Sequence, residues 1–232
     1  MKKKVFITGS NGLLGQKLVH LLRVDKQVEL IAASKGENRI SVKEGYRYIN
    51  LDITDALQME KSLFETLPDV VINTAAMTNV DACESQKEEC WQLNVIAVQQ
   101  MVNVLTTLKE KQSGYDPHFI HLSTDFVFNG EAGPYTESDR PDPLSYYALS
   151  KFESEKIVQQ SSLKWAIART IIVYGIAEAM SRTNIVLWAK GALEKGEPLS
   201  IVDDQFRMPT LAEDLAAGCI LIFKKEIGRA HV

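Results

Sequence analysis

Tyr147 and Lys151 are the residues whose types and spacing most directly predict chemistry. They form the one Tyr-x-x-x-Lys of the sequence, and on a helix this spacing places a phenol and an ammonium on the same face. The cation should lower the tyrosine pKa from about 10 towards neutrality, which suits a general acid/base. Ser123-Thr124-Asp125 ends a predicted strand before this pair. We therefore expect the Thr124 hydroxyl at the carboxyl edge of a sheet, where ligands bind.

A glycine-rich turn begins the chain. The apolar run Val5–Thr8 is followed by three glycines spaced Gly-x-x-Gly-x-x-Gly. Gly9 permits a tight turn, Gly12 permits close approach to a pyrophosphate, and Gly15 permits close packing of helix on strand. The helix that follows offers free N–H groups and the positive end of its dipole to an anion. Glycines also simply make turns, but between a strand and a helix they predict a dinucleotide site. Its expected residues are Gly9, Asn11, Gly12, Leu13, Leu14 and Gly15.

The end of the second predicted strand bears on the choice of cofactor. An acid there would bind the ribose 2′-OH and repel a 2′-phosphate, but this chain has Ser34 and Lys35. A hydroxyl and an ammonium suit a phosphate, so NADP(H) is favoured and NAD(H) stays the alternative; Lys35 as a solvated loop lysine is the other interpretation. After the third strand, Asp52 is expected to accept from the adenine amino group and Ile53 to pack on the ring. Asp52 or Thr54 could also cap the next helix.

Short apolar runs alternate with segments of helical period, which is typical of a parallel sheet with crossover helices. The predicted strands are Lys4–Thr8, Val28–Ala33, Tyr46–Asn50, Asp69–Asn73, Phe119–Leu122 and Trp165–Thr170, and the predicted helices are Leu13–Arg23, Leu57–Thr66, Lys87–Lys109, Tyr147–Gln160 and Ile185–Leu193. The expected fold class is α/β, a Rossmann doubly wound parallel sheet. We expect residues 1–175 to form the NAD(P)-binding domain and residues 176–232 to form a small C-terminal substrate lobe.

The last seven residues, 226–232, resemble the translation of a common sequencing adapter and follow an apolar helix. We therefore expect that the natural chain continues and that the substrate lobe is incomplete here. A short natural tail is the alternative, since termini are often irregular.

Composition excludes several classes of function. The 232 residues are 45% hydrophobic and 24% charged with a net charge of −4, which argues against disorder and against nucleic-acid or anionic-membrane partners. No run approaches the roughly 20 apolar residues of a membrane span. The three cysteines form no CxxC pair, which predicts reduced thiols and a cytoplasmic location. His118 and His121 flank a predicted strand and are expected to be structural rather than metal ligands.

Several motifs, in chain order, resemble those of the extended short-chain dehydrogenase/reductases and, within them, the dTDP-4-dehydrorhamnose reductase family. The resemblance covers nearly the whole chain. It rests on the glycine turn, Asn73-Thr74-Ala75-Ala76, Val80-Asp81 with Glu84, residues 123–130, Tyr147 to Lys151, Arg169-Thr170 with Val173-Tyr174-Gly175, and Asp204-Gln205-Phe206 with Pro209-Thr210.

This resemblance implies a hydride transfer from the nicotinamide to the C4 keto group of a nucleotide-activated deoxysugar, as in dTDP-rhamnose biosynthesis. Tyr147 would protonate the oxygen, Lys151 would hold the nicotinamide ribose and tune Tyr147, and Thr124 would hydrogen-bond the carbonyl. Asp125 would lie beside the sugar. The residues that would line the cofactor are Gly12 to Leu14, Asp52, Ile53, Ala75, Ala76 and Met77, together with Tyr147 and Lys151.

Three positions depart from the family pattern on the expected substrate side. Phe126 replaces the usual tyrosine, Ile172 replaces an aromatic residue that is commonly tryptophan, and Arg207 stands where glycine is usual. The first two remove polar and stacking contacts with a substrate. Arg207 could pair with a nucleotide phosphate, and a surface arginine is the alternative. Gln16 stands where some relatives have an acid that binds metal at a dimer contact, so we predict no metal and leave a homodimer open.

Two other functions stay open. One is an epimerase or dehydratase of nucleotide sugars, which uses the same tyrosine and lysine but keeps its cofactor, normally NAD(H), bound. The other is a non-catalytic dinucleotide-binding subunit like methionine adenosyltransferase beta, which resembles the same family and has an arginine near the position of Arg207. The intact Thr124, Tyr147 and Lys151 favour an enzyme.

Overall fold

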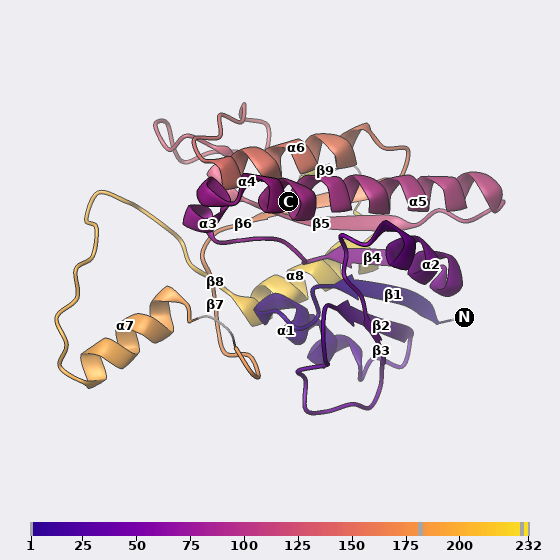
Figure 1. Cartoon of the computed structure of the whole chain (residues 1–232), viewed down its shortest axis with the longest axis horizontal. Helices are drawn as coiled ribbons and strands as arrows, with labels where there is room; N and C mark the ends of the chain where they lie inside the picture. Colours follow the sequence, from indigo (N-terminus) through magenta and orange to yellow (C-terminus); the bar gives the residue numbers. More distant parts are fainter. Residues whose placement is uncertain (1, 181–182, 228–229, 232) are drawn as a thin grey trace.

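The computed structural model describes residues 2–180, 183–227 and 230–231. Within these residues a parallel seven-stranded sheet runs in the order β3-β2-β1-β4-β5-β6-β9 (Figure 1). The strands are β1 (Lys3–Thr8), β2 (Val28–Ser34), β3 (Arg47–Asn50), β4 (Val70–Asn73), β5 (His118–Thr124), β6 (Lys164–Thr170) and β9 (Ala230–His231). The first six follow the strand order of a doubly wound dinucleotide-binding sheet. The predicted fold class is confirmed.

Burial explains why these short runs form strands. All seven residues of β5 and all four of β4 are buried, so neither strand has a solvent face. Near-continuous burial of this kind is typical of parallel sheets whose two faces are both covered by helices. Because the strands are parallel, their carboxyl ends lie at one edge of the sheet, where polar side chains can gather.

Helices cover both faces of the sheet (Figure 1). One core cluster joins the sheet to α1 (Leu13–Leu22) and α8 (Ala212–Lys224). The other contains buried side chains of α2 (Ala56–Thr66), α5 (Ala97–Lys111) and α6 (Tyr146–Gln160). Helix α8 belongs to the segment that the sequence assigned to the substrate lobe, yet Cys219 and Phe223 pack against the same core cluster as α1.

The cap of α2 differs from the residues that the sequence analysis named. Asp55 is the N-cap, and its carboxylate accepts from the backbone N–H groups of Leu57 and Gln58. Asp52 instead accepts from the N–H and hydroxyl of Thr54 at 3.0 and 2.7 Å. Asp52 thus shapes the turn before the helix, and capping by Asp52 or Thr54 was wrong because Asp55 lies at the helix start.

The predicted helix over residues 87–109 is divided into three parts. Helix α4 (Lys87–Trp91) passes through a π-helical turn, η1 (Gln92–Ile96), into α5. In the π turn lies Asn94, whose side chain donates to the carbonyl of Met77 at 3.0 Å and accepts from its N–H at 2.8 Å. Such turns frequently occur at functional sites. Here the turn fixes the segment after β4.

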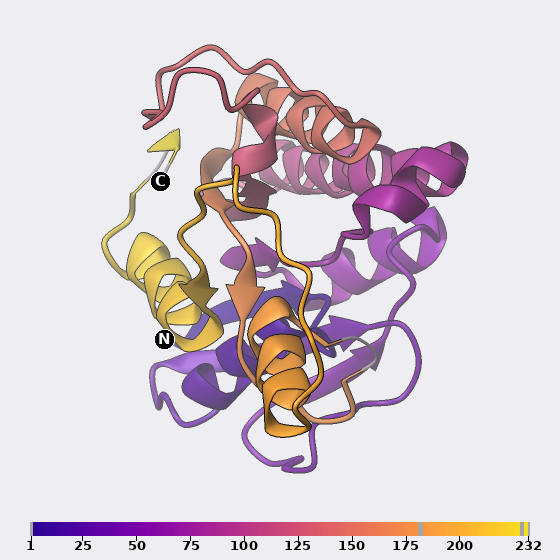
Figure 2. The same cartoon turned by 90° about the vertical axis from the view of Figure 1, so that its left-hand side faces the viewer.

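The remaining elements lie beyond the carboxyl ends of the central strands (Figures 1 and 2). They are helix α3 (Val80–Ser85), the 3₁₀ turn η2 (Asp125–Val127), a two-stranded sheet of β7 (Val173–Tyr174) and β8 (Thr210–Leu211), and helix α7 (Ile185–Glu194). Trp188 of α7 is 43% exposed.

Among the described helices, none combines the length and apolarity needed to cross a bilayer.

Candidate active site

The glycine turn between β1 and α1 is built so that side chains cannot be added. Gly9 has φ +67°, and a Cβ there would lie 2.8 Å from the backbone nitrogen of Ala75. A Cβ on Gly15 would collide with the carbonyl of Gly9 and lie 2.7 Å from the Cα of Ser10. The approach at Gly9 brings the turn against the segment after β4, and the approach at Gly15 packs the start of α1 against the turn itself. They agree with the roles that the sequence predicted for Gly9 and Gly15.

The start of α1 fits an anion. Gly12 is the N-cap, and it forms no side-chain cap, so the first N–H groups of the helix stay available. Asn11 does not aim its side chain at this point. Its amide donates to the carbonyl of Glu37 at 2.8 Å and its oxygen accepts from the N–H of Arg39 at 2.9 Å. Asn11 therefore shapes the loop after β2.

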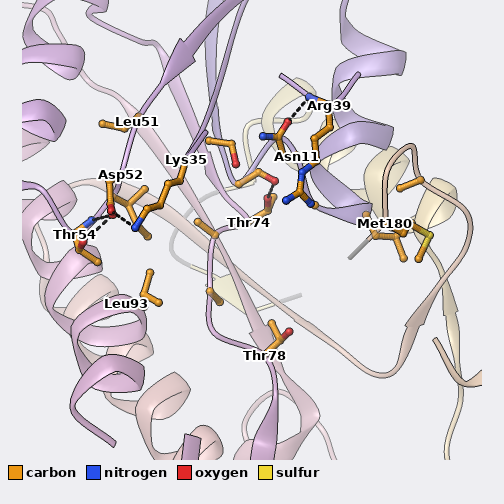
Figure 3. Close-up of a pocket in the computed structure, with 18 of the residues that line it drawn as sticks. Asn11, Lys35, Arg39, Leu51, Asp52, Thr54, Thr74, Thr78, Leu93 and Met180 are labelled. Atoms are coloured by element: carbon orange, nitrogen blue, oxygen red, sulfur yellow. Dashed lines mark hydrogen bonds and ion pairs between the residues drawn. The ribbon is translucent and has the colours of Figure 1, made fainter. Parts of the chain in front are cut away.

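A cavity of about 690 Å³ lies along this turn (Figure 3). The predicted cofactor residues that line it are Gly9, Asn11, Gly12, Leu13, Ser34, Lys35, Asp52, Ile53, Ala75 and Ala76. Leu93 and Met180, which the sequence analysis did not select, contribute apolar walls. Its lining includes residues after β2 and β3 as well as the glycine turn, a combination that suits the adenosine and pyrophosphate of a dinucleotide.

Among the described residues, two cations line this cavity, and they differ in their partners. Lys35 pairs with Asp52, with Nζ 2.7 Å from Oδ2, and this hydrogen bond with the lysine is the main cause that lowers the pKa of Asp52 to about 2. Arg39 forms no ion pair with any described residue, and its side chain extends towards the cavity beside Asn11 (Figure 3). The sequence singled out Lys35 as the phosphate ligand, but of the two described cations it is Arg39 that has no ion pair and is available to an incoming phosphate.

A second cavity, of about 460 Å³, adjoins the first. The two share walls formed by Gly12, Leu13, Val173, and the segment after β4 from Thr74 to Ala76. Other predicted residues that line the second cavity are Leu14, Gly15, Thr124, Asp125, Phe126, Tyr147 and Lys151. The three predicted catalytic residues thus come together at the end of the sheet, next to the first cavity.

Tyr147 lies in an apolar environment on the first turn of α6. Its ring meets Phe126 edge-on at 6.3 Å between centroids and packs with the buried Cys83 and Cys90. Burial raises the pKa of Tyr147, and a hydrogen bond with Thr124 opposes that rise. The predicted lowering by Lys151 is therefore not seen in this structure, because desolvation of the phenolate is the larger effect. The phenol stays protonated at neutral pH and can donate a proton.

Lys151 is buried one helical turn further along. Burial lowers its pKa to about 8, and the charge of Glu155 opposes the shift. Glu155 is itself paired with Arg169, with Oε2 2.7 Å from Nη2. The lysine nitrogen lies 3.3 Å from Nε2 of His121 on β5. His121 was expected to be structural rather than a metal ligand. It is buried, and its ring also contacts the predicted catalytic lysine.

Arg207 and Asp125 meet on the expected substrate side. Their side chains pair at 2.9 Å, and the guanidinium lies over the ring of Phe126, 4.7 Å from its centroid. Burial raises the pKa of Asp125, while Arg207 and Thr124 oppose that shift. Arg207 is therefore held beside the second cavity without lining it.

Two other predicted positions have different outcomes. Met77 lines neither cavity among the described residues, because its backbone is bound to Asn94 and its side chain packs with Tyr147. Ile172 lines the second cavity with φ +32°, which is a strained conformation for a β-branched residue. Ile172 therefore shapes the wall of the second cavity. Among the described residues, no group of three or more potential ligands is placed to hold a metal ion.

A protein-family model described as the RmlD substrate binding domain matches residues 3–232. The chain belongs to this family. Members of the RmlD family are extended short-chain dehydrogenase/reductases, which are oxidoreductases, and the resemblance seen in the sequence is confirmed. The spore coat polysaccharide biosynthesis protein SpsK of Bacillus subtilis is 32% identical over 230 residues, which cover 99% of this chain and 72% of SpsK. The probable low-salt glycan biosynthesis reductase Agl14 of Haloferax volcanii is 32% identical over 230 residues, which cover 98% of this chain and 73% of Agl14.

Solved structures agree with this membership in the RmlD family. A dTDP-4-dehydrorhamnose reductase from Clostridium acetobutylicum superposes with a TM-score of 0.82 at 32% identity, covering 99% of this chain and 73% of the other. The dTDP-4-dehydrorhamnose reductase from Bacillus anthracis, in complex with NADP, superposes with a TM-score of 0.83 at 26% identity. The match covers 100% of this chain and 75% of that enzyme. The chain is also 28% identical to the methionine adenosyltransferase 2 subunit beta of Rattus norvegicus, over 97% of this chain and 63% of that subunit.

Proposed function

We propose that this protein uses NADPH to reduce the 4-keto group of a nucleotide-activated deoxysugar. The observation that carries the proposal is the meeting of Thr124, Tyr147 and Lys151 in one cavity. That cavity adjoins the first cavity along the glycine turn and shares lining residues with it. The names of the relatives support the same class of substrate. They include a polysaccharide biosynthesis protein, a glycan biosynthesis reductase and a dTDP-4-dehydrorhamnose reductase.

The residues present fit a dinucleotide. The uncapped start of α1 would hold the pyrophosphate, and Ile53 and Leu93 would enclose the adenine. When bound, the reduced nicotinamide supplies a hydride. The protein's own residues supply the other half of the chemistry: Thr124 donates a hydrogen bond to the keto oxygen, and Tyr147 donates a proton to it. Lys151 orients the ribose with its ammonium.

Arg207 supports a nucleotide-linked substrate rather than a free sugar. Its guanidinium is a rigid donor that matches phosphate geometry, and it is placed over Phe126 at the border of the catalytic cavity. A diphosphate could take the place that Asp125 now occupies on Arg207. Asp125, Phe126 and Ile172 would then border the sugar.

The first test is the oxidation of NADPH with dTDP-4-keto-6-deoxy-mannose, followed by the absorbance of the reduced nicotinamide. We expect NADPH to bind and to be oxidised only when the keto sugar is present. Binding without oxidation by this or other 4-keto sugars would favour the non-catalytic role suggested by the methionine adenosyltransferase relative. Cofactor that co-purifies as bound NAD(H) would favour an epimerase or dehydratase. An absence of binding would contradict the proposed function altogether.

Arg39 is expected to select NADPH over NADH. Replacing Arg39 with alanine removes a cation that lines the first cavity and forms no ion pair with any described residue. A charge-assisted hydrogen bond of about 1.5–3 kcal/mol corresponds to a roughly ten- to hundredfold rise in the Kd of NADPH, with little change for NADH. Fluorescence titration of both dinucleotides measures this.

A matched control for Arg39 is Arg47→Ala. Arg47 is an exposed arginine on β3 that lines neither cavity, and its substitution should leave both Kd values unchanged. Equal losses of NADPH and NADH affinity in Arg39→Ala would show that Arg39 does not contact the 2′-phosphate.

A further inference from the structure

A buried chain of polar groups lies beneath the predicted catalytic lysine. The hydroxyl of Thr8 donates to Oδ1 of Asn73 at 2.6 Å, and Nδ2 of Asn73 lies 3.1 Å from Nδ1 of His121. The other ring nitrogen of His121 lies 2.9 Å from the Ser154 hydroxyl and 3.3 Å from Nζ of Lys151. Each of these side chains is at least 97% buried. Buried polar groups of this kind must satisfy one another.

The partners of His121 determine which of its nitrogens carries the proton. Because Oδ1 of Asn73 accepts from Thr8, the amide NH₂ faces Nδ1 of His121. Nδ1 must then accept, which leaves the proton of the neutral imidazole on Nε2. Nε2–H donates to Ser154, whose hydroxyl donates to the backbone carbonyl of Lys151 at 2.7 Å. Burial holds the pKa of His121 well below its ordinary value, so the ring stays neutral.

This tautomer has a consequence for Lys151. A nitrogen that carries a proton cannot accept from an ammonium, so the ring of His121 contacts Nζ without binding it. Among the described residues, His121 is the one side chain within hydrogen-bonding distance of Nζ. The ammonium therefore keeps its donors for the second cavity, which Lys151 lines.

We propose that His121 is a positioning residue for Lys151. Held as the Nε2–H tautomer by Thr8 and Asn73, it fixes the turn of α6 through Ser154 and withholds an acceptor from the ammonium. The donors of Lys151 then remain available for the ribose hydroxyls of the dinucleotide. This inference rests on the proposed function, because it requires a dinucleotide above Lys151.

Other ionisable groups surround His121 and Lys151. On α6 these are Tyr147 and Glu155, the latter paired with Arg169 of β6. The thiol of Cys90 on α4 also acts on Lys151. Cys83 of α3 and Asp125 of η2 act on Tyr147, while α5 contributes buried apolar side chains to this face of the sheet. Of these described groups, His121 is the one that lies within hydrogen-bonding distance of the Lys151 nitrogen.

The test is the pH dependence of NADPH binding, measured by fluorescence titration between about pH 6.5 and 9.5, a range that spans the shifted lysine pKa. In the wild-type protein, affinity should fall as pH rises through about 8, because Lys151 loses its charge there. His121→Gln offers Lys151 an amide carbonyl, which stabilises the ammonium. We expect the midpoint to rise by roughly one pH unit and the affinity at neutral pH to fall a few-fold. Lys151→Met should abolish the transition.

His118→Gln is the matched control, because it makes the same substitution in a buried histidine of the same strand. His118 lines neither cavity, so its variant should keep the wild-type midpoint even if it is less stable. An unchanged midpoint in His121→Gln would overturn the positioning role. Failure of the wild-type protein to bind NADPH at any pH would instead contradict the proposed function.

A second measurement does not depend on the folding of any variant. Nitrogen-15 NMR of the wild-type protein distinguishes the two neutral tautomers of histidine by the shifts of the two ring nitrogens. We expect His121 to remain neutral with its proton on Nε2 across the same pH range. A proton on Nδ1 would leave Nε2 free to accept from Lys151, and it would overturn the inference.

Discussion

Replacing Tyr147 with phenylalanine is expected to lower kcat for the reduction of the keto sugar by roughly 10²- to 10⁴-fold, the contribution of a positioned general acid. The Kd of NADPH should change by less than about twofold. The reason lies in what the substitution keeps and removes. The aromatic ring that packs with Phe126 and Cys83 remains, whereas the phenol that donates the proton is lost. Burial raises the pKa of this phenol, so the wild-type residue is protonated and competent as a donor throughout the neutral range.

Tyr146→Phe provides the control for Tyr147→Phe. Tyr146 is the preceding residue of the same helix, but its ring packs towards Trp91 and Lys87 and lines neither cavity. This variant should retain nearly full kcat. Comparable turnover in Tyr147→Phe and Tyr146→Phe would contradict the role of Tyr147 as the proton donor. A loss of NADPH affinity in Tyr147→Phe would indicate that the substitution disturbs the cavity rather than the chemistry.

The fold could be predicted from the sequence where burial leaves a strong pattern. Five of the six main strands, β1, β2, β4, β5 and β6, are mostly buried because helices cover both faces of the sheet. The two-residue strands β7, β8 and β9 are too short to carry a period and were not predicted. The π turn at Gln92–Ile96 was also missed, because one extra residue in a turn barely disturbs a helical pattern. Asn94 is one of several polar residues in this segment, so it gave no distinct signal.

The site was predictable where chemistry follows local spacing. The glycine turn and the Tyr147–Lys151 pair are defined within a few residues, and the structure brings both to adjoining cavities. His121 depends on Asn73, which is 48 residues away in the chain. Nothing in the apolar surroundings of His121 in the sequence indicates that partner.

Charged partners show the same limit. Lys35 and Asp52 were assigned separately to a phosphate and an adenine, yet the structure pairs them with each other. Their strands, β2 and β3, are neighbours in the sheet, so the pairing follows from the topology. Arg39 could have been found by counting cations in the loop after the second strand. Its orientation, however, depends on the hydrogen bond from its N–H to Asn11.

Gly9→Ala should combine a loss of stability with a loss of dinucleotide binding. An alanine at φ +67° is strained, and its Cβ would also lie within 3.0 Å of Ala75. Together the left-handed strain and the overpacking should lower the free energy of unfolding by roughly 2–5 kcal/mol. Because Ala75 lines both cavities, its displacement should raise the Kd of NADPH at least about tenfold, or by about 1.4 kcal/mol. Urea denaturation and fluorescence titration measure the two effects.

Gly114→Ala separates the collision at Gly9 from backbone strain alone. Gly114 has φ +82°, but a Cβ there would meet no atom within 4 Å. Its substitution should therefore cost only about 1–2 kcal/mol of stability and leave the Kd of NADPH unchanged. If Gly9→Ala behaved like Gly114→Ala in both measurements, the contact between the glycine turn and Ala75 would not shape the cofactor site. The assignment of that cavity to a dinucleotide would then lose its main geometric support, because the close approach of turn and strand is what leaves room for a pyrophosphate at the start of α1.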